Sequence, residues 1–220
     1  MSYFKTKLKY GLIITSIEEQ KKKGRYNIFL DGVYAFGLYR ESIYHFGLRV
    51  KDSIDEKQAE EFKSYDEINF GKKVAYRFLN FKPRSEKEVR GKLKSHKLSE
   101  ASIDTIIESL KEFKFINDEQ YAKMFVESKV SLKPEGKRSL KIKLAQKGIG
   151  KETSEKTVDE NYSDETEFQK AQELYTKYKK KAKGKTSLEI KQKCYRHLLS
   201  KGFSFELINR VLKIEDTGSL

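Results

Sequence analysis

Hydrophobic and polar positions alternate through three short segments near the start of the chain. The segments 12–17, 25–30 and 33–38 are rich in β-branched and aromatic residues, which is typical of strands. Asp31 and Gly32 separate the last two segments, and this pair suits the positive φ angles of a tight hairpin turn. The pattern therefore predicts a small β-meander.

The first turn of this meander is predicted at the run Lys21-Lys22-Lys23-Gly24-Arg25. Solvated lysines there would keep the hairpin edge from pairing with other chains, and this is the interpretation that we favour. Contact of the lysines with DNA phosphates is the alternative.

Beyond Gly47 the hydrophobic pattern changes to that of helices. Ser53 and Glu56 stand three residues apart ahead of a polar helix, as in a capping box, and Asp66 is expected to begin another helix. The apolar residues of that second helix are Ile68, Val74, Ala75, Phe78 and Leu79. Pro83 ends it, because proline disfavours the α conformation in the residue before it.

Two further helices are predicted to complete a small core. Ser85 and Glu88 form a second capping box, ahead of a helix that bears Val89 and Leu93. Ser99 caps the next helix. Its apolar stripe has the i, i+3, i+4, i+7 spacing of a buried face and consists of Ile103, Ile106, Ile107 and Leu110.

The apolar template of this three-helix unit occurs three times. Leu93, Leu144 and Leu198 are equivalent at spacings of 51 and 54 residues. The positions four residues earlier, five later and fourteen later are Val89, Leu140 and Cys194; Leu98, Ile149 and Phe203; and Ile107, Val158 and Leu212. Gly148 and Gly202 stand in two of the turns after the middle helix, where a left-handed residue is favoured. Thr186 with Glu189 repeats the capping-box signal in the third unit.

Two positions depart from the template. Cys194 takes a place used elsewhere by Val and Leu, so we expect a buried apolar residue of low reactivity. The last helix of the second unit, near 152–160, keeps Val158 but has polar residues where the first unit has Ile103 and Ile106. We expect that helix to pack weakly, so that it is mobile or faces a partner.

Together these patterns predict a mainly α fold. Three tandem three-helix repeat modules in an elongated arrangement follow a small N-terminal β-hairpin or meander region. The expected limits are 1–65 for the β-rich region with short helices, 66–118, 119–168 and 169–214 for the three modules, and 215–220 for a C-terminal tail.

Composition narrows the classes of function. Lys and Arg total 47 against 33 Asp and Glu, a net charge of +14, which favours an acidic partner such as nucleic acid or an acidic protein surface. A basic protein of the membrane surface is the alternative. No apolar stretch is long enough for a signal peptide or a membrane span, so we expect a soluble, cytoplasmic chain without membrane contact. Cys194 is the only cysteine, and the three histidines lack the close partners that a zinc site needs. We therefore expect no metal and no other cofactor.

Motifs of catalysis are missing from the sequence. We find no phosphate-cradling glycine-rich loop, no Gly-x-Ser-x-Gly and no His-Glu-x-x-His. The chain is therefore predicted not to be an enzyme.

The segment Phe115-Ile116-Asn117-Asp118-Glu119-Gln120-Tyr121-Ala122 joins the first unit to the second. Asn117 or Asp118 caps the helix that follows, and Gln120 closes a capping box three residues after Asn117. The middle helix of the preceding unit opens with Arg84-Ser85-Glu86-Lys87-Glu88. With the threefold period of about 50 residues, these features resemble the RecX family of recombination regulators over roughly 72–214.

This resemblance implies a protein of tandem three-helix modules that binds the RecA recombinase, above all its filament on single-stranded DNA. We expect the chain itself to be a monomer. The resemblance also implies that the protein restrains or remodels this filament, in DNA repair and the SOS response, and of these we favour inhibition of recombination and ATP hydrolysis by RecA. The family has no catalytic residues to transfer. Residues 1–65 look like the additional N-terminal region of longer members.

Clusters of basic residues on the polar sides of the helices are the candidate contacts to recombinase or DNA. They are Lys72, Lys73, Arg77, Arg90, Lys92, Lys94, Lys137, Arg138, Lys141, Lys143, Lys179, Lys180 and Lys181. The last three belong to the stretch 177–185, which contains no acid. We expect a discontinuous stripe whose binding weakens steeply with salt, whereas exposed lysines that only keep the protein soluble are the alternative.

Tyr175 and Tyr178 stand beside these lysines at the i, i+3 spacing of a helix face. Tyr175 is assigned to the third core. For Tyr178 the sequence leaves open whether the ring lies in the core or stacks on unpaired bases.

Two other functions fit the same pattern. A general single-stranded DNA- or RNA-binding helical array would be equally basic and helical but would need no recombinase. An adaptor for another acidic protein would bind no oligonucleotide in a salt-sensitive way.

Overall fold

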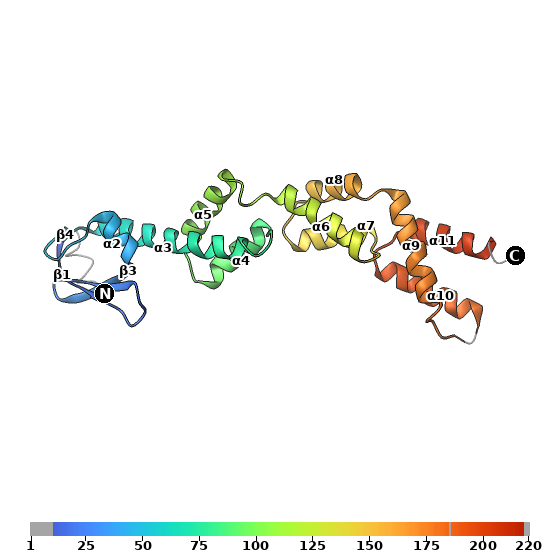
Figure 1. Ribbon diagram of the computed structural model, residues 1–220, viewed down its shortest axis with the longest axis horizontal. Helices are drawn as coiled ribbons and strands as arrows, with labels where there is room; N and C mark the ends of the chain where they lie inside the picture. Colours follow the sequence, from blue (N-terminus) through green and yellow to red (C-terminus); the bar gives the residue numbers. More distant parts are fainter. Residues whose placement is uncertain (1–10, 185, 218–220) are drawn as a thin grey trace. The chain divides into compact units, whose positions relative to one another are not determined.

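Contacts divide the chain into two compact units, the first of residues 1–82 and 89–113 and the second of residues 83–88 and 114–220. The structure is a computed structural model that describes residues 11–184 and 186–217 (Figure 1). The start of the predicted N-terminal region, Lys185 of the lysine-rich stretch and the end of the predicted tail, 218–220, lie outside the described residues.

The first unit opens with a four-stranded antiparallel sheet of order β3-β2-β1-β4. The predicted meander consists of β1 (Leu12–Glu19), β2 (Arg25–Leu30) and β3 (Val33–Tyr39). The two-residue strand β4 (Ser53–Ile54), which the sequence did not predict, pairs with β1. Asp31 and Gly32 have φ angles of 46° and 78°, which confirms the hairpin turn.

One face of the sheet is buried against α3 (Glu56–Leu79). This core contains Leu12, Ile14, Ile28, Leu30, Phe36, Leu38 and Ile54 from the strands and Ala59 and Phe62 from the helix. The short helix α2 (Arg40–Phe46) follows β3 and ends at Gly47, whose φ of 64° is left-handed.

Helix α3 corrects two predictions. It is one continuous helix of 24 residues, capped by Asp55 and Gln58 rather than by Ser53 and Glu56, because Ser53 is held in β4. Asp66 does not begin a helix but lies buried within α3. Its carboxylate accepts hydrogen bonds from the Tyr39 amide (2.7 Å) and the Ser42 hydroxyl (2.6 Å), so it fastens the β3–α2 junction to α3.

The remaining helices form three three-helix modules, as predicted, but the limits of the third differ: it begins at Asp164 rather than at 169, and its last helix runs to Thr217, into the predicted tail. The end of α3 with α4 (Glu86–Ser95) and α5 (Glu100–Glu112) makes the first. The second consists of α6 (Asp118–Leu132), α7 (Lys137–Gln146) and α8 (Lys151–Asn161). The third consists of α9 (Asp164–Lys179), α10 (Ser187–Ser200) and α11 (Phe205–Thr217). All twelve positions of the apolar template are buried, which confirms the mainly α repeat fold.

Helix starts follow the predicted caps. The Glu88 amide donates to Ser85 Oγ (3.3 Å) while the Ser85 amide donates to the Glu88 carboxylate (3.2 Å), so this capping box is complete. Ser99, Asn117 and Thr186 each accept a bond from the amide three residues later. Cys194 and Tyr175 lie in the third core, as predicted.

Helix α8 packs more firmly than its sequence predicted. Ser154 and Thr157, at the positions of Ile103 and Ile106, are buried together with Val158. Tyr162, which follows the helix, is 1% exposed, and its hydroxyl donates to the Glu135 carbonyl (3.0 Å). Small polar residues and one large aromatic ring thus fill the space that isoleucines fill in the first module.

A set of contacts that we call the inter-module joint occurs twice in the second unit. In the first joint, Ser85 Oγ donates to the Lys147 carbonyl (2.7 Å) and the Glu86 amide to the Asp118 carboxylate (2.9 Å). The start of a middle helix is thereby tied to the next module's turn and to the first turn of its first helix.

In the second joint, the equivalent positions make equivalent bonds. The Gly136 amide donates to the Lys201 carbonyl (2.9 Å) and the Lys137 amide to the Glu167 carboxylate (2.7 Å). The spacings of 51 and 54 residues that relate the modules also relate Ser85 to Gly136 and Lys147 to Lys201. The joint therefore belongs to the repeat itself.

The joints explain the turn glycines. Gly148 and Gly202 have φ angles of 89° and 85°, as predicted for these turns. A Cβ at Gly202 would lie 2.5 Å from the Ser139 amide nitrogen, and one at Gly136 would lie 2.2 Å from the Gly202 oxygen. In the first module, Lys97 takes the equivalent place with a φ of 62°, since no earlier module packs on that turn.

Helix α10 is longer than its counterparts. It has 14 residues where α4 and α7 have 10 each, and the added turn lies at its start. Ile190, equivalent to Ser85 and Gly136, therefore lies inside the helix. A Cβ at Gly184 would lie 2.9 Å from Ile190 Cγ1, so the preceding loop covers this position.

Candidate nucleic-acid interface

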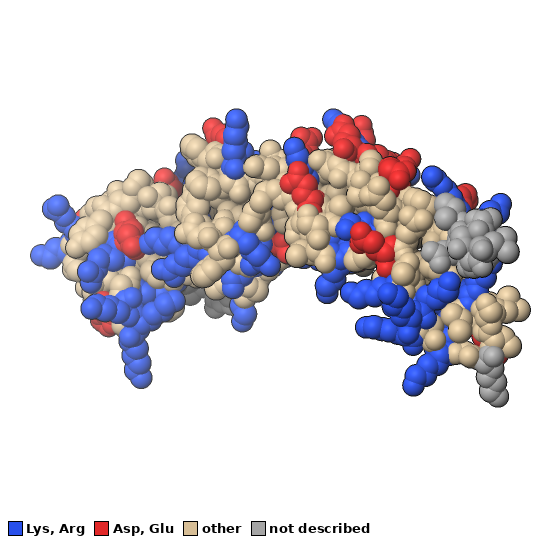
Figure 2. Space-filling view, turned by 45° about the vertical axis from the view of Figure 1, so that its right-hand side comes forward, with Lys and Arg blue, Asp and Glu red and all other residues tan. Residues whose placement is uncertain are grey.

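The end of α9, the loop after it and α10 form the most basic stretch of the chain. Residues 177–201 contain ten Lys or Arg and a single acid, Glu189. Figure 2 shows Lys and Arg side chains gathered over the third module, whereas acidic side chains lie along the α8 side of the same unit. The charge asymmetry makes the third module the first place to look for an anionic partner.

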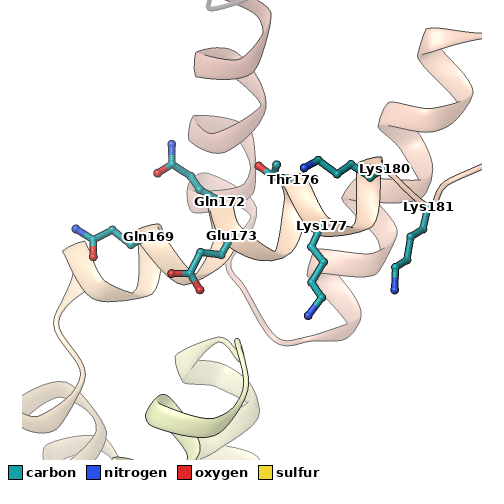
Figure 3. A pocket seen from close by; sticks show the side chains of 7 residues that line it. All are labelled: Gln169, Gln172, Glu173, Thr176, Lys177, Lys180 and Lys181. Atoms are coloured by element: carbon teal, nitrogen blue, oxygen red, sulfur yellow. The ribbon is translucent and has the colours of Figure 1, made fainter.

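A shallow hollow of about 760 Å³ lies along α9. Its lining residues are Gln169, Gln172, Glu173, Thr176, Lys177, Lys180 and Lys181. Figure 3 shows Lys177 and Lys181 pointing the same way from the end of the helix. Glu173 is paired with Lys170 (3.3 Å), which offsets the one negative charge of the hollow.

A second hollow of about 580 Å³ lies between the end of α9 and α10. Its lining residues are Tyr178, Lys181, Ala182, Lys183, Lys193, Arg196 and His197. None of these is an acid, and Lys181 lines both hollows. The two hollows are therefore adjacent parts of one basic surface.

Local folding places these side chains. Thr186 caps α10, and Cys194 and Leu198 turn into the core, so that Lys193 and Arg196 lie on the opposite, exposed side of the helix. The Lys193 ammonium donates to the Lys183 carbonyl and ties the loop to α10.

An aromatic pair lines the second hollow. The rings of Tyr178 and His197 are stacked, with centroids 3.9 Å apart and planes 7° apart. Tyr178 is half-buried and also packs against the third core. Stacking of its ring on unpaired bases stays a prediction. Burial, and then the charge of Lys201, hold the pKa of His197 below its usual value, which keeps its ring neutral at pH 7.

The basic residues of the second module are placed differently. Lys137 pairs with Asp164 and with Asp159 (3.7 Å), and Lys141 pairs with Asp159 (3.0 Å). Lys143 pairs with Glu135. Of the second module's four predicted residues, Arg138 has no ion pair within residues 11–184 and 186–217.

The first unit divides its predicted residues in the same way. Lys73 pairs with Glu41 (2.6 Å), Arg90 with Asp104 (2.6 Å) and Lys94 with Glu100 (2.9 Å). Three of the predicted residues of this unit have no ion pair among the described residues: Lys72, Arg77 and Lys92.

In the third module, Lys179 lies over the Tyr175 ring, 5.4 Å from its centroid, and only Lys180 and Lys181 of the thirteen candidates line the hollows. Sequence reasoning missed Lys193 and Arg196. Their i, i+3 spacing on a capped helix, in a stretch 190–201 without acids, was the available signal.

Other chemistry finds little support in the part of the chain that the structure describes. Among those residues, no group of three or more His, Cys, Asp or Glu is arranged to hold a metal ion. Nor does any described helix have the length and apolar character to cross a membrane.

The fold and this surface define a tandem three-helix-repeat protein with one strongly basic module. Four consecutive segments match domain models of one family: the regulatory protein RecX N-terminal domain (residues 12–55) and the first, second and third three-helix domains of RecX (72–110, 117–158 and 165–212). The chain belongs to the RecX family of regulatory proteins.

Similar proteins cover nearly all of the chain. The regulatory protein RecX of Clostridium beijerinckii is 36% identical over 204 residues, which are 91% of this chain and 94% of the relative. RecX of Listeria welshimeri is 32% identical over 94% of this chain and 77% of its own length. A crystal structure of regulatory protein RecX matches with a TM-score of 0.70 and 28% identity over 92% of this chain and 99% of its own. RecX from Lactobacillus salivarius matches with a TM-score of 0.64 and 29% identity over 70% and 99%.

Proposed function

We propose that this chain regulates the RecA recombinase by binding its filament on single-stranded DNA and restraining its recombination and ATPase activities. Its membership of the RecX family over four consecutive domains is the observation that carries this proposal. A filament presents the same surface many times, so tandem modules can add several weak contacts into one strong attachment.

The regulator acts in the cytoplasm as a monomer, within DNA repair and the SOS response, and has no catalytic activity of its own. Its contribution is binding energy, since a ligand that favours one state of a partner shifts that partner's equilibrium by its difference in affinity. The basic surface of the third module supports a contact with DNA or with acidic recombinase surface.

The test is ATP turnover by RecA on single-stranded DNA with the protein added below, at and above stoichiometry. We expect turnover to fall at far fewer than one copy per recombinase subunit. Unchanged turnover at every ratio, with salt-sensitive binding to bare strand, would instead identify a general single-strand-binding array.

Affinity for bare and recombinase-coated strands separates the same two functions. A filament regulator binds the coated strand more tightly, whereas a general array binds the two equally or prefers the bare strand.

A further inference from the structure

We propose that the two hollows of the third module form one track for the phosphate backbone of single-stranded nucleic acid. The proposal assigns this contact to Lys177, Lys180, Lys181, Lys193 and Arg196, and excludes the paired lysines of the second module. It rests on the proposed function, since a regulator of a filament on DNA meets the strand that the filament covers.

The continuity of the track comes from Lys181, which lines both hollows. Lys177 and Lys180 flank it along α9, and Lys193 and Arg196 flank it on α10. A polyanion with regularly spaced charges can therefore contact one hollow and then the next without leaving basic surface.

Helix stabilisation explains only part of this charge. Lysines in the last turn of a helix interact favourably with its dipole, which accounts for Lys177 and Lys179 in α9. Lys193 and Arg196 lie in the middle of α10, where the dipole gives no such benefit. No ion pair joins either of them to an acid among the described residues, so no carboxylate neutralises their charges, although the Lys193 ammonium also donates to the Lys183 carbonyl.

The neutral lining groups also fit phosphate. Gln169, Gln172 and Thr176 line the first hollow and can donate hydrogen bonds, as amide and hydroxyl groups commonly do to phosphate oxygens. The stacked Tyr178–His197 pair lines the second hollow, and aromatic rings beside a basic groove are typical of proteins that bind single strands. An acidic protein surface would use the charges but offers no bases to stack on the rings.

The second module lacks an equivalent track because its lysines are already paired. Asp159 and Asp164 hold Lys137, Asp159 also holds Lys141, and Glu135 holds Lys143. A phosphate would have to displace these carboxylates, whereas no such displacement is needed at Lys180 or Lys181.

The first experiment measures fluorescence anisotropy of a labelled oligothymidylate with the full chain over a range of salt concentrations. Two double variants test the track from different helices: Lys180→Gln with Lys181→Gln, and Lys193→Gln with Arg196→Gln. Each is expected to weaken binding roughly tenfold and to reduce the slope of log K against log salt by about 1.4, or 0.7 per lost contact.

The matched control is Lys123→Gln with Lys156→Gln, two exposed lysines of α6 and α8 with the same total charge change. We expect its affinity to stay within about twofold of the parent chain. Equal losses in the control and the track variants would overturn the proposal, because net charge alone would then set the affinity. Thermal unfolding by circular dichroism checks that all variants fold.

The second experiment replaces the phosphodiesters with uncharged methylphosphonate linkages and leaves the bases intact. A phosphate track predicts that binding is lost, and undiminished binding would overturn it.

Track variants that bind bare strand normally but fail to restrain RecA would place this surface against recombinase and overturn the strand assignment while the proposed function stands. Loss of strand binding in the variants, with a parent chain that never affects RecA, would leave the track standing and remove the function.

Discussion

The second and third modules share one helical frame but use their basic residues in opposite ways. Equivalent apolar positions are buried in both. In the second, three of the four candidate basic residues pair with carboxylates of Glu135, Asp159 and Asp164. In the third, lysines gather around hollows whose lining contains one acid, Glu173. Lysine content therefore says little about binding until the positions of the nearby acids are known.

The largest effect is expected where the two modules meet. Gly136→Ala places a Cβ 2.2 Å from the Gly202 oxygen, and because that atom is backbone it cannot turn aside. We expect a loss of about 2–3 kcal/mol in the free energy of unfolding, measured by urea denaturation.

Gly150→Ala is the matched control, because Gly150 also precedes a helix as its N-cap and a Cβ there would have no neighbour within 4 Å. Equal stability of the two variants would show that the second joint is not as tight as the structure indicates.

The stability of the fold is expected to depend on pH through Glu167 in the second joint. Burial raises the pKa of this carboxyl, although the Lys137 amide and charge counter it. The folded state then holds the proton more tightly than the unfolded state, so the cost of the charged form is present at pH 7 and disappears as pH falls towards 4.5. Glu167→Gln keeps an acceptor for Lys137 and should raise the melting temperature at pH 7, and the gap should close as the pH falls through the raised pKa and below the ordinary value of 4.5.

At the first joint, the pKa of the Glu88 carboxyl is shifted in the opposite direction. Burial alone would raise the pKa of Glu88, but the bonds from Lys147 and Ser85 and nearby positive charge outweigh it and hold the pKa below its usual value. Glu88→Gln should therefore lower the melting temperature at pH 7 and lose this effect as the acid is protonated. A change of melting temperature in the same direction for both variants at pH 7 would contradict the opposite pKa shifts of Glu167 and Glu88.

The smallest effect is expected from releasing one lysine of the second module. Asp159→Asn removes the partner of Lys141, 3.0 Å away, and leaves Lys137 with Asp164. The released lysine should steepen the salt dependence of oligonucleotide binding by up to about 0.7. Glu165→Gln makes the same charge change at an exposed site without an ion pair among the described residues and should leave the slope unchanged.

The repeat and its caps were predictable because they depend on local spacing. Leu93, Leu144 and Leu198 identify equivalent cores, and Ser85 with Glu88 identifies a helix start. The continuity of α3 was not predictable in this way, since Asp66 resembles a cap until the β3–α2 junction that it bonds is known.

The candidate site was predictable only in part. The lysine-rich stretch 177–185 pointed to the third module, but Lys193 and Arg196 join it through the packing of α10 beside α9. Conversely, Lys137 and Lys141 appeared available because their partner Asp159 is distant in sequence. Contacts between helices determine which basic residues are paired and which line the hollows. The spacing of residues along the sequence does not reveal these contacts.

The added turn of α10 has a consequence for growth of the repeat. Helices α4 and α7 each begin at a position that bonds the next module. Gly184 covers the equivalent position, Ile190, in the third module. We therefore expect the third module to accept no further module at this position. A duplicated copy of it would form a third joint only if α10 began one turn later.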